Sequence, residues 1–322
     1  MQRLWKDHTE EATAQDWTSA RELFFLRCRS KNLSDHSLYW YKTVLGGFLR
    51  FLEGVGAPTP RETTPNIVRA YFEQLRERGQ SSITINRTYG ALRCFFRYLS
   101  QERVIPATPF SLIEKPKVEK KLIRPLNMDQ VRLLLAQPKT KTFCGFRNWV
   151  MMLLMLDTGL RLGEALGLRR DRIDWQASRL TVLGKGDKER AVPFGAAVKK
   201  ALWDYSQWRG DVAGQDIFFL DQFGGQICSR HFQIMLKRYG NGAKIEGVRV
   251  SPHTLRHTFA TQYILNGGDA FSLQAMLGHS TLEMVKIYVR LANRDVALQH
   301  QRYSPIDKLG PLSSGRRAVR FR

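Results

Sequence analysis

The most informative stretch of this 322-residue chain reads Ser251-Pro-His-Thr-Leu-Arg-His-Thr-Phe-Ala-Thr261. Ser251 is a favoured N-cap and Pro252 fits the first helical position, so the stretch predicts a helix that begins here. His253 and Arg256 then share one face of the first turn. Because free N–H groups and the helix dipole favour anions at that end, the capped H-x-x-R pair indicates an anion site. A lone histidine would more often be structural.

A second informative segment follows, Leu277-Gly-His-Ser-Thr-Leu-Glu-Met-Val-Lys-Ile-Tyr288. Gly278 is expected to end one helix, and Ser280 with Glu283 predicts a capping box for the next. Tyr288 falls within that next helix, on a different face from Ile287. Taken alone, such a tyrosine is usually an amphipathic core residue.

Two upstream segments carry further basic residues. In Thr158-Gly-Leu-Arg-Leu-Gly-Glu164, the glycine allows a tight turn and Arg161 begins a new helix. Glu164 lies on the same helical face, where it can brace a basic neighbour, although an ordinary surface Arg–Glu pair is the alternative. In Leu183-Gly-Lys-Gly-Asp-Lys188, a turn between strands presents Lys185. The spacing differs from a nucleotide-binding P-loop, and a solvent-facing turn lysine is equally compatible.

Helical periodicity covers the first third of the chain, which predicts a small all-α bundle. The expected helices lie within residues 15–32, 34–56, 64–79 and 81–103, with Thr64 and either Ser81 or Ser82 as N-caps. The stretch 104–126 has four prolines, a lysine cluster and no sustained period. It reads as an interdomain linker whose lysines either contact phosphates or are simply solvated.

The pattern changes after this linker. Asn127 is expected to cap a helix, residues 146–159 read as a buried helix ended by Gly159, and another helix begins at 160. Short strands are predicted at 172–176, 178–184 and 189–194, and helices return up to about 304. The fold class is therefore mainly α with a small antiparallel β-sheet. We expect an N-terminal helical domain at 1–106, a linker at 107–124, an α+β catalytic domain at 125–305 and a basic tail at 306–322.

Charge points to a polyanionic partner. Lys and Arg total 51 against 29 acidic residues, a net charge of +22. Residues 121–322 carry 32 basic and 16 acidic side chains, so the second half holds most of the excess. Nucleic acid is the usual partner of such a chain, although a merely basic surface is the alternative. The four cysteines are far apart and lack the spacing of zinc ligands, which predicts reduced thiols and no zinc.

No membrane or export segment is apparent. The chain has no stretch of about 20 apolar residues and no apolar core near its start, so we expect a cytoplasmic protein without membrane contact.

Together, the four segments resemble the catalytic domain of the tyrosine recombinase (phage integrase) family. The match covers about residues 125–305, and the simpler Xer-like or mobile-element form fits the chain length better than integrases with an additional arm-binding domain. The preceding bundle resembles, more loosely, the SAM-like core-binding domain of that family. The catalytic positions of the family match Arg161, Glu164, Lys185, His253, Arg256, His279 and Tyr288 in order, type and spacing.

The resemblance implies transesterification on DNA. Tyr288 would be the nucleophile, and Arg161 and Arg256 would hold the scissile phosphate. His253 and His279 would complete the clamp, with one of them taking the Tyr288 proton, and Lys185 would protonate the leaving 5′ oxygen. Glu164 would orient His253 or another neighbour. Because one ester is exchanged for another through a 3′-phosphotyrosyl link, no nucleotide or metal cofactor is expected.

The resemblance also implies partners. These are a double-stranded DNA recombination site, a homo-tetramer that exchanges strands through a Holliday junction, and an accessory or directionality protein. The C-terminal helix and tail would dock on a neighbouring protomer, or the tail would bind phosphates. The expected role is integration or excision of a mobile element, or replicon resolution. A type IB topoisomerase-like strand transferase, a non-catalytic DNA-binding regulator and a metal-dependent nuclease or transposase are the alternatives.

Overall fold

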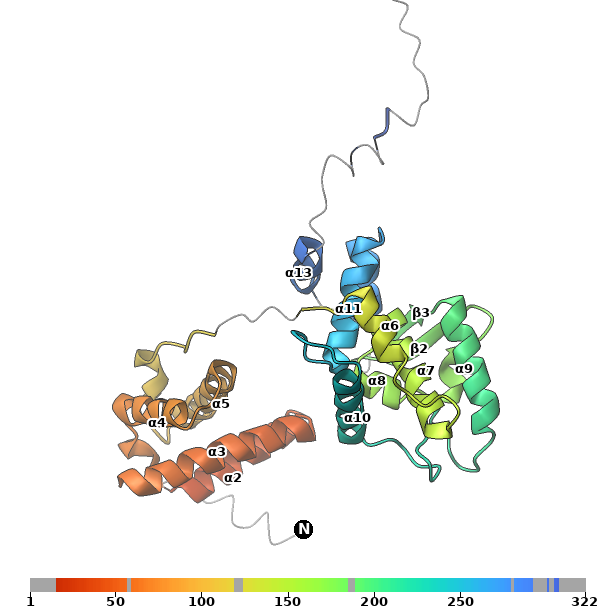
Figure 1. Ribbon diagram of the computed structural model, residues 1–322. Helices are drawn as coiled ribbons and strands as arrows, with labels where there is room; N and C mark the ends of the chain where they lie inside the picture. Colours follow the sequence, from red (N-terminus) through yellow and green to blue (C-terminus); the bar gives the residue numbers. More distant parts are fainter. Residues whose placement is uncertain are drawn as a thin grey trace, which may run out of the picture. The chain divides into compact units, whose positions relative to one another are not determined.

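The structure is a computed structural model, and it describes residues 16–56, 59–118, 124–184, 189–278, 281–291, 300 and 304–306. The chain divides into two compact units between Lys121 and Leu122. Figure 1 shows the first unit in red to yellow and the second in yellow to blue. No helix in the described ranges is long and apolar enough to cross a membrane.

The first unit is helical. Its helices are α2 (Trp17–Ser30), α3 (Asp35–Val55), α4 (Pro65–Glu77) and α5 (Ser82–Gln101), with the short 3-10 helix η1 (Pro60–Glu62) before α4. Thr64 caps α4 through a side-chain hydrogen bond from the Ile67 N–H, and Ser81 caps α5 in the same way. The predicted bundle and its caps are therefore confirmed.

Aromatic side chains fill the core of this unit. Phe24, Phe48, Phe95 and Phe96 are almost completely buried. Phe24 meets Phe95 edge to face with ring centroids 5.1 Å apart, and Phe48 meets Phe96 in the same way at 5.8 Å. Such edge-to-face pairs add to the stabilisation from burial itself. The three long helices α2, α3 and α5 are thereby held together around one aromatic cluster.

The first half of the predicted linker is packed on this unit. The 3-10 helix η2 (Pro109–Leu112) buries Phe110 in the aromatic core. Tyr89 Oη donates a hydrogen bond to the Ile113 carbonyl at 3.0 Å, and Asn86 Nδ2 donates to the Pro116 carbonyl at 2.6 Å. The segment lacks periodicity because it is fastened by individual side chains, and not because it is a free tether.

The second unit contains the remaining elements. They are α6 (Met128–Leu135), α7 (Phe143–Thr158), α8 (Leu162–Leu166), η3 (Arg170–Arg172), β1 (Ile173–Asp174), β2 (Arg179–Leu183), β3 (Glu189–Pro193), α9 (Ala196–Arg209), α10 (Ser229–Gly242), α11 (Pro252–Leu265), α12 (Ala270–Leu277) and α13 (Glu283–Leu291). The strands form an antiparallel sheet in the order β1-β2-β3, with Leu180 opposite Val192. The described residues confirm the prediction of a mainly α fold with a small antiparallel sheet.

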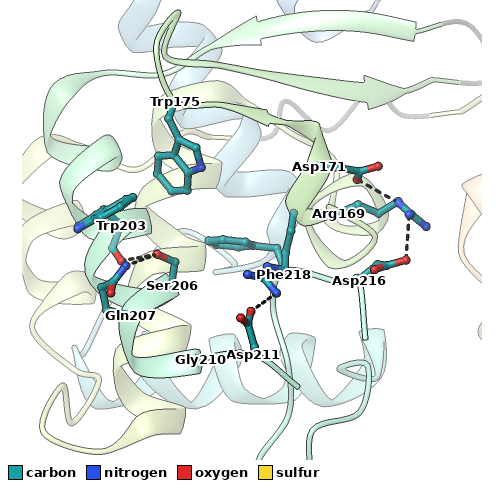
Figure 2. Close-up of a pocket in the computed structure, with 11 residues that line it drawn as sticks. Arg169, Asp171, Trp175, Trp203, Ser206, Gln207, Gly210, Asp211, Asp216 and Phe218 are labelled. Carbon is teal, nitrogen blue, oxygen red and sulfur yellow. Dashed lines mark hydrogen bonds and ion pairs between the residues drawn. The ribbon is translucent and has the colours of Figure 1, made fainter. Parts of the chain in front are cut away.

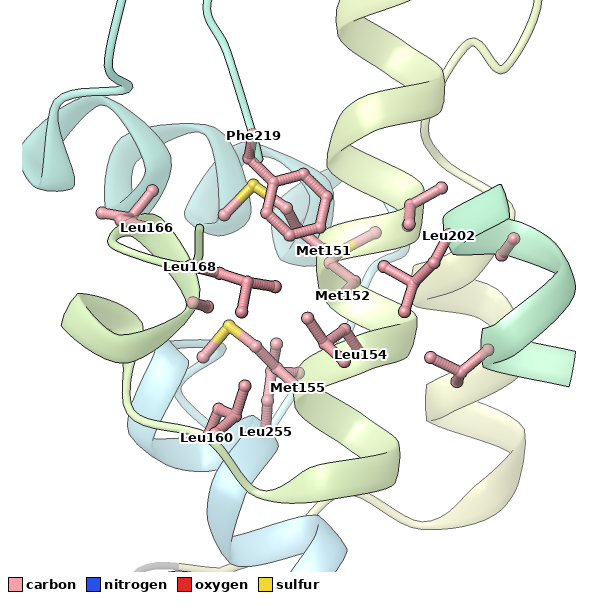
Figure 3. Close-up of a cluster of buried hydrophobic side chains, with 14 of the residues drawn as sticks. Met151, Met152, Leu154, Met155, Leu160, Leu166, Leu168, Leu202, Phe219 and Leu255 are labelled. Atoms are coloured by element: carbon pink, nitrogen blue, oxygen red, sulfur yellow. The ribbon is translucent and has the colours of Figure 1, made fainter. Parts of the chain in front are cut away.

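Helix α7 lies at the centre of the second unit. Met151, Met152, Leu154 and Met155 are fully buried, which explains why this helix is apolar almost all round. They share a buried cluster with Leu168 after α8, Leu202 on α9, Phe219 after α9 and Leu255 on α11 (Figure 3). Because α7 ends at Thr158 with Gly159 as its C-cap, two residues before Arg161, this packing fixes the position of the predicted anion-binding arginine.

Candidate active site

The start of α11 has the N-cap and the first-turn proline that the sequence predicts. Ser251 Oγ accepts a hydrogen bond from the Thr254 N–H at 3.2 Å, and Pro252 is the first helical residue. His253 is exposed, whereas the Arg256 side chain points inward and the residue is only 6% exposed. His253 therefore lies at the surface of the site, and Arg256 lies in its interior.

Arg256 joins three parts of the chain. Its Nη1 donates a hydrogen bond to the Gly159 carbonyl at 2.6 Å, and its Nη2 donates to the Leu277 carbonyl at 2.8 Å. Burial, and then the nearby Arg161 guanidinium, lower the pKa of Arg256 to about 10. The side chain therefore stays charged at neutral pH, in surroundings where a second positive charge makes an anion favourable.

Gly159 permits this arrangement. Its φ of +64° lies in the left-handed region, and it closes α7 by donating its N–H to the Met155 carbonyl. A Cβ at this position would lie 2.4 Å from Phe259 Cδ1 and 2.7 Å from Leu277 Cδ2. The prediction that Gly159 ends the helix is confirmed, and the close packing shows a second reason for glycine here.

Glu164 holds two arginines beside this centre. Its carboxylate accepts hydrogen bonds from the Arg161 N–H at 2.8 Å and from Arg161 Nη1 at 2.9 Å. Arg190 on β3 donates to the two carboxylate oxygens at 2.9 and 2.7 Å. Burial alone would raise the pKa of Glu164, but the hydrogen bonds from Arg190 and Arg161 outweigh it, so the pKa is lowered. The expectation that Glu164 braces a basic neighbour is confirmed.

The end of α12 is held by two arginine side chains. Arg190 Nε donates a hydrogen bond to the Met276 carbonyl at 2.9 Å, and Arg256 holds the next carbonyl, that of Leu277. Carbonyls at a helix C-terminus have no partner within the helix and attract cations. Gly278 follows in the left-handed conformation and ends α12, as predicted. The chain therefore leaves α12 from a fixed point next to Arg256.

Tyr288 is buried beside Arg256. It packs with Phe259, Leu277 and Val285 in a hydrophobic cluster formed by α11, α12 and α13, and it is 4% exposed. Its hydroxyl makes a hydrogen bond of 2.8 Å with His257 Nδ1. Burial raises the pKa of Tyr288, and the positive charge of Arg256 opposes this shift. The phenol is therefore neutral at rest, and the neighbouring guanidinium stabilises its anion.

His257 completes the described part of the site. It lies one helical turn after His253 on α11 and is partly buried. Burial, and then the proximity of His253 and Arg256, lower the pKa of His257. The imidazole is therefore neutral at physiological pH.

The structure brings together five of the seven residues singled out by the sequence, namely Arg161, Glu164, His253, Arg256 and Tyr288. Lys185, His279 and the predicted capping residue Ser280 lie outside the described residues, as does most of the basic tail. Arg190 and His257 were not predicted. His257 stands in the quoted stretch, four residues after His253, and that spacing was the available signal.

A separate cavity of about 680 Å³ lies on the same unit, between the loop around β1 and helix α9. Trp175 and Trp203 form its aromatic wall, with ring centroids 5.5 Å apart (Figure 2). Its charged side chains pair with one another, for example Arg169 with Asp216 at 3.0 Å. The cavity therefore offers no charge excess like that around Arg256. Over the described ranges, no cluster of three or more His, Cys, Asp or Glu residues is placed to hold a metal ion.

Known proteins match both units. Residues 124–294 match the phage integrase family, and residues 23–103 match the phage integrase N-terminal SAM-like domain. The tyrosine recombinase XerC of Anoxybacillus flavithermus is 34% identical over 279 residues, which cover 85% of this chain and 91% of the relative. The tyrosine recombinase XerD of Shewanella oneidensis is 34% identical over 280 residues, which cover 86% and 93%.

Solved structures share the fold. The XerH recombinase bound to palindromic difH DNA is 19% identical, with a TM-score of 0.71 over 89% of this chain and 85% of the other. A lambda integrase dimer bound to a COC′ core site is 18% identical, with a TM-score of 0.73 over 87% and 79%. The Tn1549 transposon integrase in complex with circular intermediate DNA is 20% identical, with a TM-score of 0.70 over 92% and 100%.

Proposed function

This chain belongs to the phage integrase family and is a tyrosine site-specific recombinase, and we propose that Tyr288 is the nucleophile with which it cleaves DNA. The observation that carries the assignment is the position of the phenol beside Arg256. A phenol attacks a phosphate poorly at neutral pH unless positive charge stabilises the phenolate. Arg256 supplies that charge at the required place.

Arg161 and Arg256 hold the scissile phosphate in this proposal. Arg256 is fixed by the Gly159 and Leu277 carbonyls, and Arg161 by Glu164, so both cations are oriented before DNA arrives. Preorganised positive charge of this kind stabilises the additional negative charge of the transition state. His253, exposed at the helix N-terminus, adds a donor to the same phosphate.

The reaction is an exchange of esters. The Tyr288 oxygen forms a bond to phosphorus while the bond from phosphorus to the 5′ oxygen breaks, and Lys185 donates a proton to that leaving oxygen. His279 contributes a further donor to the phosphate. The 3′-phosphotyrosyl link keeps the phosphoester bond, so a 5′-hydroxyl of a second strand can reverse the attack without nucleotide hydrolysis. The arginines supply the charge that a metal ion supplies in other phosphoryl-transfer enzymes.

Membership of the family, and not the chemistry of one site, supports a proposal for the assembly. We infer a homo-tetramer that joins two duplexes and exchanges strands through a Holliday junction, in the cytoplasm where its DNA substrate lies. An accessory or directionality protein would set the direction of exchange. The core-binding and catalytic regions at 1–106 and 125–305, the joining segment at 107–124 and the basic tail at 306–322 would together contact the recombination site. The net charge of +22 supports DNA as the partner.

The test is to trap the covalent intermediate. The full-length protein is incubated with fragmented genomic DNA, the reaction is stopped with detergent, and the DNA in covalent complexes is sequenced to locate the cleavage position. A nicked duplex carrying that position then serves as a suicide substrate, because the short cleaved strand diffuses away and prevents religation. The wild-type protein should accumulate a 3′-linked adduct on it.

Tyr288→Phe should bind the nicked duplex and form no adduct. Tyr239→Phe is the matched control. It also removes a tyrosine hydroxyl of the second unit that takes part in a side-chain hydrogen bond, since Tyr239 Oη accepts from Asn148 Nδ2 at 3.2 Å. The control should form the adduct at close to the wild-type rate. A covalent complex that persists in Tyr288→Phe would show that another residue is the nucleophile.

A further inference from the structure

The hydroxyl of the proposed nucleophile contacts a histidine that has no assigned role. His257 Nδ1 lies 2.8 Å from Tyr288 Oη, a normal hydrogen-bond distance for this pair of atoms. The two rings are tilted by 48° with centroids 5.4 Å apart, so they meet at their polar edges and are not stacked. The contact is therefore polar in character.

The direction of this hydrogen bond follows from the ordinary acidities of the two groups. A neutral imidazole carries one N–H and one bare nitrogen, and the phenol O–H is the more acidic donor. With the proton on Nε2, Nδ1 accepts the phenol proton in the hydrogen bond. Burial disfavours the imidazolium ion, so His257 rests neutral, and its Nε2–H tautomer is the one in which Nδ1 accepts from the phenol.

The neighbouring histidine is placed for a different task. His253 lies one helical turn earlier on α11 and is exposed, whereas His257 is partly buried between α11 and α13. Residues four apart on a helix are neighbours on one face, and their different burial places His253 towards solvent and His257 deeper in the same site. In the proposed mechanism the exposed His253 is open to the incoming phosphate, whereas His257 contacts the hydroxyl of Tyr288.

We propose that His257 is the general base of the cleavage step and takes the proton of Tyr288 at Nδ1. This inference rests on the proposed role of Tyr288 as nucleophile. As Oη bonds to phosphorus, its proton moves to Nδ1, and the leaving 5′ oxygen receives a proton from Lys185. One proton is taken up and one is released, so each cleavage leaves the charge of the site balanced. In religation the His257 imidazolium returns its proton to the departing phenol oxygen.

The charged surroundings suit this transfer. His253 and Arg256 face His257 on α11, Tyr288 faces it from α13, and Arg161, Glu164 and Arg190 surround Arg256. Burial, and then the nearby His253 and Arg256, lower the pKa of His257 and keep the imidazole neutral before DNA binds. A bound phosphate adds negative charge to the same centre, which makes the protonated imidazole easier to form at the moment of attack. Binding of the DNA phosphate is thus expected to raise the pKa of His257 and make it a stronger base.

The experiment measures single-turnover adduct formation on the nicked duplex described above, from pH 5 to pH 9, with protein in excess. Three proteins are compared: the wild type, His257→Asn and His257→Leu. The asparagine amide oxygen replaces Nδ1 as an acceptor but cannot take a proton, whereas leucine removes the acceptor. Thermal unfolding and non-covalent binding of the same duplex are measured for each, so that a folding defect is recognised.

The expected wild-type rate rises with pH below about 6.5 and then reaches a plateau, since only the neutral imidazole acts as a base. Both variants should lose this acidic limb and fall by about 10²–10⁴-fold on the plateau, the usual contribution of a general base. Binding of the duplex should change less than threefold. His257→Asn should retain the thermal midpoint more closely than His257→Leu.

Two results would overturn the proposal. One is adduct formation by both variants within threefold of the wild type at every pH. The other is full recovery in His257→Asn with a loss in His257→Leu, since an acceptor without proton transfer would then suffice. Both results leave the nucleophile assignment intact, because that assignment fails only if Tyr288→Phe forms the adduct. A variant that fails to bind or fold is replaced by His257→Gln, which is judged by the same two criteria.

Discussion

Arg190 and Glu164 form a two-point ion pair: the guanidinium donates to the two carboxylate oxygens at 2.9 and 2.7 Å, and the side chains are 12% and 8% exposed. A pair this well covered is costly to break on one side, because the remaining charge stays buried without its partner. The same carboxylate also orients Arg161, one of the two arginines proposed to hold the phosphate.

Glu164→Gln should lower the free energy of unfolding by about 2–4 kcal/mol, since an amide replaces a carboxylate that accepts charge-assisted hydrogen bonds from two arginines. Urea denaturation measures this loss. Glu189→Gln is the matched control, because the Glu189–Arg172 pair is largely exposed and should contribute no more than about 1 kcal/mol. Equal losses in the two variants would contradict the structural role of Glu164.

Stability should fall with decreasing pH in two steps. The folded state lowers the pKa of His257 below its ordinary 6.5, so the unfolded state takes up a proton first and stability declines as the pH drops below about 6.5. The folded state also lowers the pKa of Glu164, so its contribution is present above pH 4.5 and is lost as the pH falls through the folded value. Urea titrations between pH 8 and pH 3 should show His257→Asn with a smaller first step and Glu164→Gln with a smaller second step. Unchanged profiles in both would refute this linkage.

Gly159→Ala should be strongly destabilising and should abolish cleavage. The left-handed backbone costs about 1–2 kcal/mol for alanine, and the clash with Phe259 and Leu277 adds roughly 1–3 kcal/mol. Gly56→Ala is the control: Gly56 caps α3 at φ +70°, and no described atom lies within 4 Å of the position an alanine methyl group would take, so only the backbone cost applies. The difference between the thermal midpoints of the two variants measures the packing contribution at Gly159. Similar decreases in the two midpoints would argue against that contribution.

Arg256→Lys should retain DNA binding and lose cleavage by about 10²–10³-fold. A lysine ammonium cannot satisfy the Gly159 and Leu277 carbonyls and at the same time present a planar pair of donors to a phosphate. Adduct formation on the suicide substrate, compared with band-shift binding to the same duplex, measures both properties. Near-normal cleavage by the lysine variant would mean that point charge alone is sufficient at this position.

Local signals in the sequence predicted much of this molecule. Thr64, Ser81, Asn127 and Ser251 cap helices where the patterns placed them, because capping depends on three or four consecutive residues. The hairpin and the glycine stop at Gly159 are equally local. The bond between Arg161 and Glu164 also follows from helical spacing.

The contacts that escaped prediction join distant segments. Arg190 reaches Glu164 across 26 residues, and His257 reaches Tyr288 across 31, in each case from another element. Such pairs depend on how β3 packs near α8 and how α13 packs on α11, which no local pattern specifies. Phe110 is a similar case, because its burial in the aromatic core reveals an anchored segment where proline content suggested only a linker.

The hydrogen bonds from Arg256 to the Gly159 and Leu277 carbonyls make the orientation of this guanidinium depend on the folded state of the second unit. In the proposed mechanism, the charge of Arg256 is in place for the phosphate only while α7, α11 and α12 hold their native positions, since this side chain bonds to the ends of α7 and α12. We therefore expect a partly unfolded copy to lose cleavage while its net charge of +22 still attracts DNA.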